Sequence, residues 1–281
     1  FQANLELMAA AVAQARSAAA DLVVFTELAT VGYPPGDLLE RPEFIDRNLE
    51  QLARVAALSD ERLGILVGFV ERNESGVGKA LYNAAALCHR GRVVDSTRKC
   101  LLPTYDVFDE ARYFEPGAEV RPLELHGVRL GVSVCEDAWA DPDRDGQSLY
   151  TRDPVLELIH HGAQLLINIS ASPFELGKAA ARRELVRRHA VNAGRFFVYA
   201  NQVGGNDELV FDGHSMIFDG AGRVVARARD FAADLLLYEI PERGLGAATG
   251  VEGPPGELRP VSGSREAEAI AALELGLRDF V

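Results

Sequence analysis

The chain has 281 residues, of which 48% are hydrophobic and 25% charged, a composition typical of a globular protein and unlike that of disordered, collagenous or disulfide-stapled chains. Its length fits one large domain or two small ones. The formal net charge of -13 would repel nucleic-acid phosphates and anionic lipids, so we expect neither nucleic acid nor a membrane as a partner.

Along the first two thirds of the chain, predicted helices and strands alternate. Apolar residues at helical spacing predict a helix over 4–20, and an apolar run predicts a buried strand over 21–25. The turn 89–92 lies between two further apolar runs and predicts a hairpin. The remaining predictions are strands over 63–70, 80–88, 93–97, 128–134, 163–169 and 196–200, and a helix over 175–193.

The last third of the chain is predicted to hold strands, a linker and a final helix. Residues 209–218 and 223–228 are expected to pair across the turn 219–222, and 233–240 is the last predicted strand. The Gly- and Pro-rich stretch 244–264 is predicted to be a linker, and 265–280 regains helical spacing. We therefore expect a domain over 1–243, a linker over 244–264, and the start of a second domain over 265–281.

The three cysteines, Cys88, Cys100 and Cys135, form no Cys-x-x-Cys pair, and the chain shows no leader of the secretory kind. The odd number of cysteines and the absence of such a leader favour a reducing compartment, and we expect a cytoplasmic protein. The chain opens with Phe1 rather than Met and enters a predicted helix at once, so we expect it to be a piece of a longer protein.

Three polar residues follow directly on predicted strands or hairpins, where sheet enzymes expose functional groups. Cys135 ends the run 128–134, and a sharp turn there would present a nucleophilic thiol. Glu27 follows an apolar strand and is placed to act as a base, and Lys99 could supply a fixed positive charge. Taken singly, each has a simpler reading, namely an inert core cysteine, a solvated loop carboxylate and a surface lysine.

The segments around these residues resemble the carbon-nitrogen hydrolase, or nitrilase, superfamily. They are 23–28 (Val-Val-Phe-Thr-Glu-Leu), 98–103 (Arg-Lys-Cys-Leu-Leu-Pro) and 132–139 (Val-Ser-Val-Cys-Glu-Asp-Ala-Trp), and they occur in family order. Within the superfamily, segment 102–114 is similar to the glutaminase domains of NAD synthetases. The resemblance implies an α/β fold, a nitrilase-like four-layer α-β-β-α sandwich.

The resemblance also implies a set of site residues. Cys135 would be the nucleophile, Glu27 the general base, Lys99 the oxyanion-stabilising cation, and Glu110 a second glutamate that holds the lysine and the substrate amide. Substrate-binding roles fall on Tyr105, Glu136, Trp139, Ser172 and Lys178. Without the resemblance, Glu110 and Lys178 would read as solvated charges on helices.

The implied function is hydrolysis of glutamine to glutamate and ammonia, with no metal or organic cofactor. The ammonia would serve a C-terminal synthetase domain that uses ATP with Mg²⁺ to convert nicotinic acid adenine dinucleotide to NAD. This chain carries no Ser-Gly-Gly-x-Asp-Ser loop for ATP, so we expect that domain elsewhere in a longer parent chain. Family members generally associate, and we expect a homo-oligomer.

Two other functions remain open from the sequence. A free-standing amidase of the same superfamily, such as an ω-amidase, would use the same residues on another small amide. A catalytically silent oligomerisation module is disfavoured by the intact set of polar residues. Among weaker candidates, His160 and His161 lack a third metal ligand in the pattern, and His214 lacks the Gly-x-Cys-x-Gly elbow of a Cys-His dyad.

Overall fold

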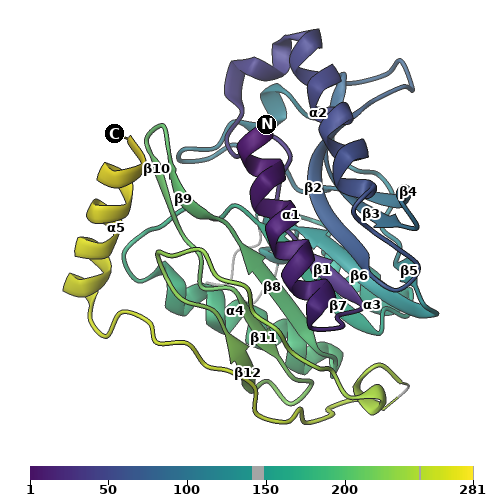
Figure 1. Cartoon of the computed structure of the whole chain (residues 1–281), viewed down its shortest axis with the longest axis vertical. Coiled ribbons are helices and arrows are strands. Elements are labelled where there is room, and N and C mark those ends of the chain that lie inside the picture. The colour runs from purple at the N-terminus through teal and green to yellow at the C-terminus, as the bar shows by residue number, and fades with distance from the viewer. Residues whose placement is uncertain (141–148, 247, 281) are drawn as a thin grey trace.

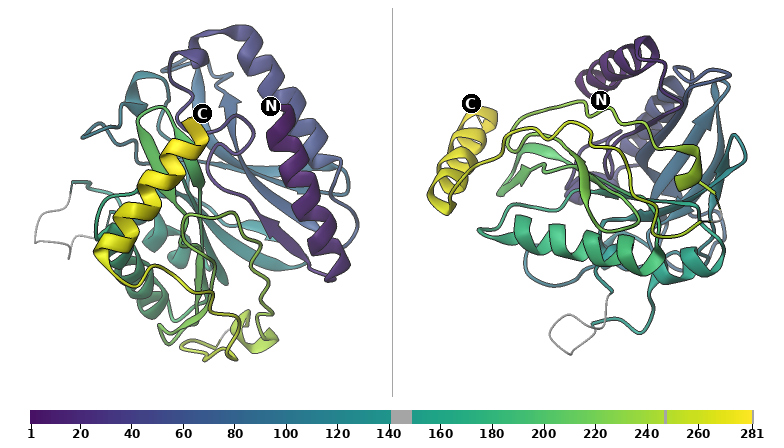
Figure 2. Two further views of the ribbon diagram at one scale, coloured as in Figure 1. Left: turned by 60° about the vertical axis from the view of Figure 1, so that its left-hand side comes forward. Right: turned by 90° about the horizontal axis from the view of Figure 1, so that it is seen from below.

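The computed structural model describes residues 1–140, 149–246 and 248–280 and shows a four-layer α-β-β-α sandwich (Figures 1 and 2). The first sheet has the strand order β1-β2-β3-β4, and the second has the order β12-β11-β8-β7-β6-β5. A separate two-stranded ribbon pairs β10 with β9. The layer order confirms the fold class that the resemblance implied.

The first sheet consists of β1 (Leu22–Val24), β2 (Gly64–Arg72), β3 (Leu81–His89) and β4 (Arg92–Arg98). The second consists of β5 (Leu123–Leu125), β6 (Val128–Val134), β7 (Leu165–Ser170), β8 (Phe197–Asn201), β11 (Met216–Phe218) and β12 (Val224–Arg227). The ribbon is β9 (Val203–Asn206) with β10 (Leu209–Asp212).

Helices cover the outer face of each sheet. Helices α1 (Gln2–Ser17) and α2 (Pro42–Ala56) lie on the first sheet, and α3 (Pro154–His160) and α4 (Lys178–Ala193) lie on the second. Helix α1 buries Leu5, Met8 and Val12, whose spacing of three and four residues forms one apolar face. A separate apolar core fills the space between the two sheets.

The sheet directions decide where the candidate functional residues lie. Strand β1 is parallel to β2, and β4 runs in the same direction because two antiparallel pairings separate it from β2. In the second sheet β6, β7 and β8 are parallel. The carboxyl ends of β1, β4, β6 and β7 therefore carry the segments that begin at Phe25, Lys99, Cys135 and Ala171.

Several elements differ from the sequence-based expectation, and the short strands β5 and β9 are among those not predicted. Helix α2 was not predicted, although Pro42 in its first turn and buried Ile45, Leu52 and Val55 at helical spacing are signals for it. The single strand over 209–218 is wrong: β10 and β11 are separate, because Gly213 and His214 adopt left-handed backbone conformations between them. The strand over 233–240 is also wrong, since these residues form no ladder there.

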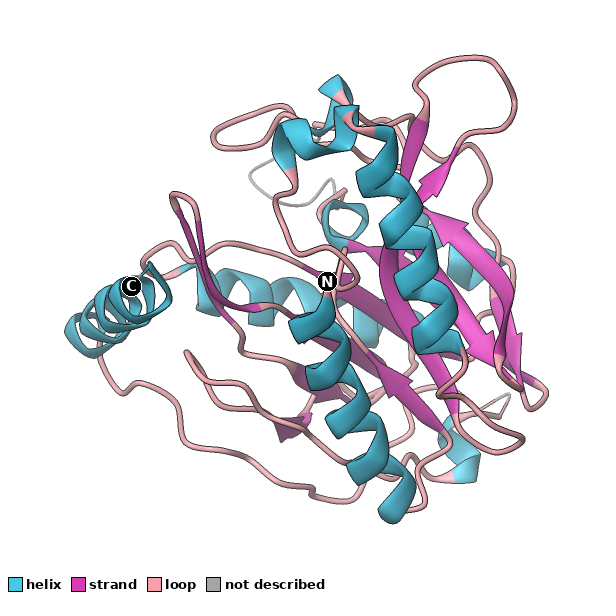
Figure 3. Ribbon diagram, turned by 45° about the horizontal axis from the view of Figure 1, so that its top comes forward, coloured by secondary structure: helices cyan, strands magenta, loops and turns pink. Residues whose placement is uncertain are grey.

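Within the predicted linker, residues 256–259 run beside β12, and helix α5 (Arg265–Phe280) follows. Arg227 N donates to Glu257 O at 2.9 Å, and Arg259 N donates to Arg227 O at 2.9 Å. Helix α5 packs on the β9–β10 ribbon through Leu275 (Figure 3). Among the helices that the structure describes, none combines the length and the apolar character needed to cross a bilayer.

Candidate active site

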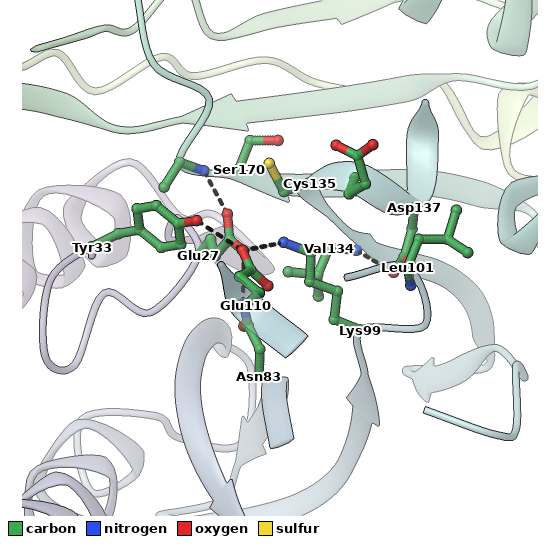
Figure 4. A network of polar contacts seen from close by, with 12 residues as sticks. Glu27, Tyr33, Asn83, Lys99, Leu101, Glu110, Val134, Cys135, Asp137 and Ser170 are labelled. Carbon is green, nitrogen blue, oxygen red and sulfur yellow. Dashed lines mark hydrogen bonds and ion pairs between the residues drawn. The ribbon is translucent and has the colours of Figure 1, made fainter. Parts of the chain in front are cut away.

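The structure brings Glu27, Lys99 and Cys135 together from three different strand ends. Glu27 follows β1, Lys99 follows β4, and Cys135 follows β6. In Figure 4 the carboxylate, the ammonium and the thiol converge between the two sheets. These residues lie far apart in the chain, so only the tertiary packing of the sheets brings them together.

Lys99 lies between two carboxylates. Its Nζ atom is 2.8 Å from Glu27 Oε1 and 2.7 Å from Glu110 Oε1. The side chains of Lys99 and Glu27 are 0% exposed and that of Glu110 is 6% exposed, which rules out the solvated readings of all three. Burial alone would lower the pKa of Lys99, but Glu110 and Glu27 hold that pKa well above its usual value, so the side chain stays an ammonium.

Neutral donors complete the surroundings of these two carboxylates. Tyr33 Oη donates to Glu110 Oε1 at 2.8 Å, and Asn83 Nδ2 donates to Glu27 Oε1 at 2.7 Å and to Glu110 Oε2 at 3.4 Å. The backbone N-H of Ala171 donates to Glu27 Oε2 at 2.8 Å. We call Glu27, Tyr33, Asn83, Lys99 and Glu110 the Lys99 cluster. All four carboxylate oxygens of this cluster accept hydrogen bonds, which fixes their orientation.

Cys135 sits at the start of a short 3₁₀ turn, Cys135–Ala138, directly after β6. Its φ of 44° lies in the left-handed region, which a residue with a side chain adopts only when its surroundings impose it. Burial, followed by the charge of Glu27, raises the pKa of the thiol well above its usual value, while Lys99 acts in the opposite direction. The resting group is therefore a neutral thiol that needs a base before it can attack.

Asp137 ties the nucleophile turn to the segment that carries the lysine. Its Oδ1 atom accepts from the N-H groups of Cys100 and Leu101, both at 2.9 Å, and its Oδ2 atom accepts from Val134 N at 3.0 Å. The carboxyl group is fully buried, and burial raises its pKa to about 7 although the three N-H donors act against that rise. This residue joins the ends of β4 and β6 (Figure 4).

Glu136 presents a buried carboxylate that two tyrosines hold. Tyr105 Oη donates to Glu136 Oε1 at 2.8 Å and to Oε2 at 3.0 Å, and Tyr150 Oη donates to Oε1 at 2.8 Å. Burial raises the pKa of Glu136, with the hydrogen bond from Tyr150 and the charge of Lys99 acting against the rise. The charge of Lys99 thus also acts on Glu136, which lies outside the Lys99 cluster.

The other predicted substrate-binding residues take different places. Lys178 begins helix α4 and is half-buried, and its burial lowers its pKa while the charges of Glu175 and Glu136 act to raise it. Ser172 is buried two residues beyond β7, where its backbone N-H donates to Asn201 Oδ1 at 2.9 Å. Trp139 packs against the apolar core under α3 and α4.

Sequence reasoning missed Tyr33, Asn83, Asp137 and Tyr150. Asn83 carried a usable signal, because it is a polar residue inside the otherwise apolar run of β3. Asp137 adjoins the Cys-Glu pair, but nothing in the sequence shows that its partners are the backbone of residues 100 and 101. Tyr33 and Tyr150 lie in irregular segments, where no periodicity points to the direction of a side chain.

Comparisons with known proteins agree with this geometry. The model of the carbon-nitrogen hydrolase family matches residues 1–248. A glutamine-dependent NAD(+) synthetase of Synechocystis sp. is 40% identical over 237 residues, which are 83% of this chain and 42% of that protein. One from Thermotoga maritima is 34% identical over 310 residues, covering 100% of this chain and 51% of that protein. The chain therefore spans about half the length of these curated relatives.

Solved structures give a similar result. A glutamine-dependent NAD+ synthetase from Acinetobacter baumannii, in complex with ADP, matches with a TM-score of 0.82 and 31% identity over 100% of this chain and 49% of that one. A mutant amidase from Nesterenkonia sp. AN1, with acrylamide added at its active-site cysteine, matches with a TM-score of 0.70 and 25% identity. That match covers 86% of this chain and 88% of the amidase.

Proposed function

We propose that this chain, which belongs to the carbon-nitrogen hydrolase family, hydrolyses the side-chain amide of glutamine and supplies the ammonia for amidation of nicotinic acid adenine dinucleotide to NAD. The observation that carries the proposal is the buried Glu27–Lys99 pair beside the Cys135 thiol. A base, a cation and a nucleophile in one water-poor site are the groups that acyl transfer from an amide requires. The curated relatives that bear the name of a glutamine-dependent NAD(+) synthetase support the choice of substrate and product.

In the first half-reaction Glu27 accepts the thiol proton as Cys135 Sγ attacks the carboxamide carbon of glutamine. The Lys99 ammonium, together with a backbone N-H near Cys135, stabilises the oxygen that becomes negative. The tetrahedral intermediate then collapses, the C-N bond breaks, and Glu27 passes its proton to the leaving ammonia. The product on the enzyme is a γ-glutamyl thioester.

In the second half-reaction water hydrolyses that thioester. Glu27 takes a proton from the water as its oxygen attacks the thioester carbon, and Lys99 again stabilises the oxyanion. The C-S bond breaks, the sulfur regains a proton from Glu27, and glutamate leaves. The cycle uses side chains of this chain alone, so no metal or organic cofactor is proposed for it.

Glu136 and Lys178 are proposed to recognise the amino-acid end of glutamine. The Glu136 carboxylate, held by Tyr105 and Tyr150, suits the α-ammonium, and the Lys178 ammonium suits the α-carboxylate. Ser172 and Trp139 complete the proposed substrate contacts. Opposite charges at two points would select a zwitterionic amide over a simple aliphatic one.

The direct test is glutamate release from glutamine, set beside a panel of other amides. We expect glutamine to be preferred, and Cys135→Ala to lose at least about 1000-fold in kcat because it removes the nucleophile. Glu136→Gln should lower kcat/KM for glutamine by about 10- to 100-fold, as expected for one charged hydrogen bond, and should leave butyramide hydrolysis within about threefold. Equal use of glutamine and butyramide by the wild type would reject glutamine as the substrate.

A free-standing amidase remains the second candidate, because the chain matches 88% of the Nesterenkonia amidase but only about half of each NAD synthetase. The same panel separates the two functions. A free-standing amidase would prefer another amide and would be insensitive to the Glu136 charge.

The synthetase chemistry is proposed for a separate region of a longer, homo-oligomeric cytoplasmic protein. In this proposal residues 1–243 form the glutaminase, 244–264 are the linker and 265–281 begin the region that uses ATP and Mg²⁺. This chain, given glutamine, ATP, Mg²⁺ and nicotinic acid adenine dinucleotide, should release glutamate without forming NAD. Formation of NAD by this chain alone would refute that division of labour.

A further inference from the structure

The segment that carries Glu27 crosses the first sheet directly over Gly68 of β2. Strand β1 pairs with β2 as far as Val24 opposite Leu66, and Phe25 N still donates to Leu66 O at 2.8 Å. The chain then rises over the next residues of β2. Gly68 N donates to Thr26 O at 3.2 Å, and Gly68 O accepts from Thr30 N at 3.2 Å.

The space above Gly68 is filled by backbone atoms of residues 26–28. A Cβ atom at position 68 would lie 2.3 Å from Leu28 N, 2.5 Å from Thr26 O and 2.7 Å from the carbonyl carbon of Glu27. All three distances are far below van der Waals contact, and none of these atoms belongs to a flexible side chain. Any side chain at position 68 must therefore displace the peptide of Glu27.

The backbone is also strained directly after Glu27. Leu28 is fully buried and has a φ of 47°, in the left-handed region that a leucine rarely adopts. Its carbonyl accepts from Val31 N at 2.9 Å and from Gly32 N at 2.7 Å, which holds the turn closed. The backbone next to Glu27 is thus held in a strained conformation that these hydrogen bonds support.

We propose that Gly68 is a positioning residue for the general base. Its missing side chain lets the Glu27 peptide lie against β2, so that the Glu27 carboxylate meets Lys99, Asn83 and Ala171 N at once. The inference rests on the proposed function only in taking Glu27 as the base. A displacement of about 1 Å at a reacting group can lower a rate by about 100-fold, so a methyl group at position 68 acts mainly on turnover.

Gly64 offers a matched control on the same strand. A Cβ atom there would lie 2.6 Å from Leu125 Cδ2, the flexible end of a side chain on the opposite sheet, and would leave residues 26–28 untouched. Both substitutions add one methyl group to a buried position of β2. They differ in whether the neighbour that must move carries the base.

The experiment measures kcat, KM and urea unfolding for wild type, Gly68→Ala and Gly64→Ala with the amide that the wild type hydrolyses best. We expect Gly68→Ala to lose about 100-fold in kcat with KM within about threefold, because Tyr105, Glu136 and Lys178 come from other elements. Gly64→Ala should keep kcat within about threefold. If the wild type uses an amide other than glutamine, the substrate assignment fails while this comparison still stands.

A double-mutant cycle distinguishes positioning from general loss of structure. In a Glu27→Gln background, Gly68→Ala should lower the residual kcat by less than about threefold, since the base through which Gly68 acts is already absent. A full additional loss of about 100-fold would overturn the proposal, as would a kcat within about threefold of wild type for Gly68→Ala alone. Failure of Gly68→Ala to fold while Gly64→Ala folds would also overturn it, because Gly68 would then serve the sheet rather than the base.

Discussion

Two buried charge clusters lie on either side of the segment that follows β7. The first is the Lys99 cluster. The second, which we call the Arg182 cluster, consists of Arg182 on α4, Tyr199 on β8, Asp212 at the end of β10, and His214. The segment links them, because Ala171 N donates to Glu27 and Ser172 O accepts from Arg182 Nη1 at 3.5 Å.

The two clusters have similar components but differ in how completely they are hydrogen-bonded. Every carboxylate oxygen of the Lys99 cluster accepts a hydrogen bond, whereas Arg182 meets Asp212 through one oxygen only. In the described part of the chain, Asp212 Oδ1, Arg182 Nε and His214 Nε2 have no hydrogen-bond partner, whereas in the Lys99 cluster this holds for the amide oxygen of Asn83 but for no charged group. A buried ion pair by itself is therefore weak evidence of a reaction site, and the thiol beside the Lys99 cluster is what distinguishes it.

The largest effect should come from Lys99→Met. It removes the cation proposed to stabilise the oxyanion and leaves two buried carboxylates unpaired, so we expect kcat to fall about 1000-fold or more and the free energy of unfolding to fall by about 3–5 kcal/mol. Complete burial of Lys99 implies that both turnover and folding stability suffer. Glutamate release and urea unfolding are measured together.

The control for this variant is Lys79→Met, which removes an exposed lysine and should change neither quantity. A Lys99→Met protein as stable as the wild type would contradict the buried ion pairs. Substantial turnover by the folded variant would contradict the oxyanion role.

Arg182→Met tests whether the second cluster is structural. It leaves the buried Asp212 carboxylate without its cation, so the free energy of unfolding should fall by about 3–5 kcal/mol. The kcat of the folded variant should stay within about tenfold, because Arg182 donates to the backbone of Ser172 and not to a side chain of the Lys99 cluster in the described structure. Arg183→Met, on the exposed face of the same helix, is the matched control. A loss of kcat as large as that of Lys99→Met would give the Arg182 cluster a part in the chemistry.

Asp137→Asn sharpens the comparison with a third buried carboxylate, one whose described partners are backbone N-H groups. The asparagine side chain keeps one acceptor oxygen, but its NH2 group would face backbone N-H groups that now donate to the carboxylate. The ends of β4 and β6 should therefore shift, and kcat should fall by about 10- to 100-fold. Asp153→Asn is the control, since Asp153 also accepts a backbone N-H, that of Leu156, at an exposed helix start where asparagine caps equally well. Unchanged kcat in Asp137→Asn would show that this link is dispensable.

Asp137→Asn should also change how the free energy of unfolding depends on pH. Because the pKa of Asp137 is about 7 in the folded protein and about 4 when unfolded, the folded state binds the proton more tightly in between. The stability that this group contributes is present below about pH 4 and is lost as the pH rises to about 7. Urea unfolding at about pH 5 and about pH 8 should show a smaller difference for Asp137→Asn than for the wild type, and equal differences would contradict the shift.

Much of the fold could be predicted from the sequence because buried strands leave continuous apolar runs. The runs that became β2, β3, β6 and β7 were read correctly for this reason. The run over 209–218 misled because left-handed backbone at Gly213 and His214 leaves no mark in hydrophobic spacing. Residues 233–240 misled because Leu236 and Tyr238 pack on the core without pairing in a ladder.

The candidate site could be predicted best at residues that stand at or shortly after the end of a strand. Glu27, Lys99 and Cys135 do so, and their flanking segments carry the family resemblance. Asn83 and Tyr33 donate hydrogen bonds to Glu110 from positions 27 and 77 residues away in the chain. Asp137 accepts a hydrogen bond from the backbone N-H of Cys100. Such contacts depend on how the sheets stack, which local sequence does not encode.

The smallest effect should come from His214→Asn. The sequence raised His214 as a possible partner of the thiol, but the structure places its Nε2 atom 3.6 Å from Asp212 Oδ2, within the Arg182 cluster. Asparagine tolerates the left-handed backbone, with φ of 57°, that this position requires. We therefore expect kcat within about threefold of wild type, and a loss of about 100-fold would restore a Cys-His mechanism.

His214→Asn should still alter stability at acid pH, and the sign follows from burial. Burial lowers the pKa of His214, with Asp212 acting in the opposite direction, so the folded state holds this proton less tightly than the unfolded chain does. The contribution of neutral His214 is present above the unfolded pKa of about 6.5 and is lost as the pH falls through the folded value. Between about pH 8 and about pH 5 the wild type should therefore lose more stability in urea than His214→Asn. An equal loss in both proteins would mean that His214 takes up its proton as readily when folded, and the Arg182 cluster would then carry a second positive charge at acid pH.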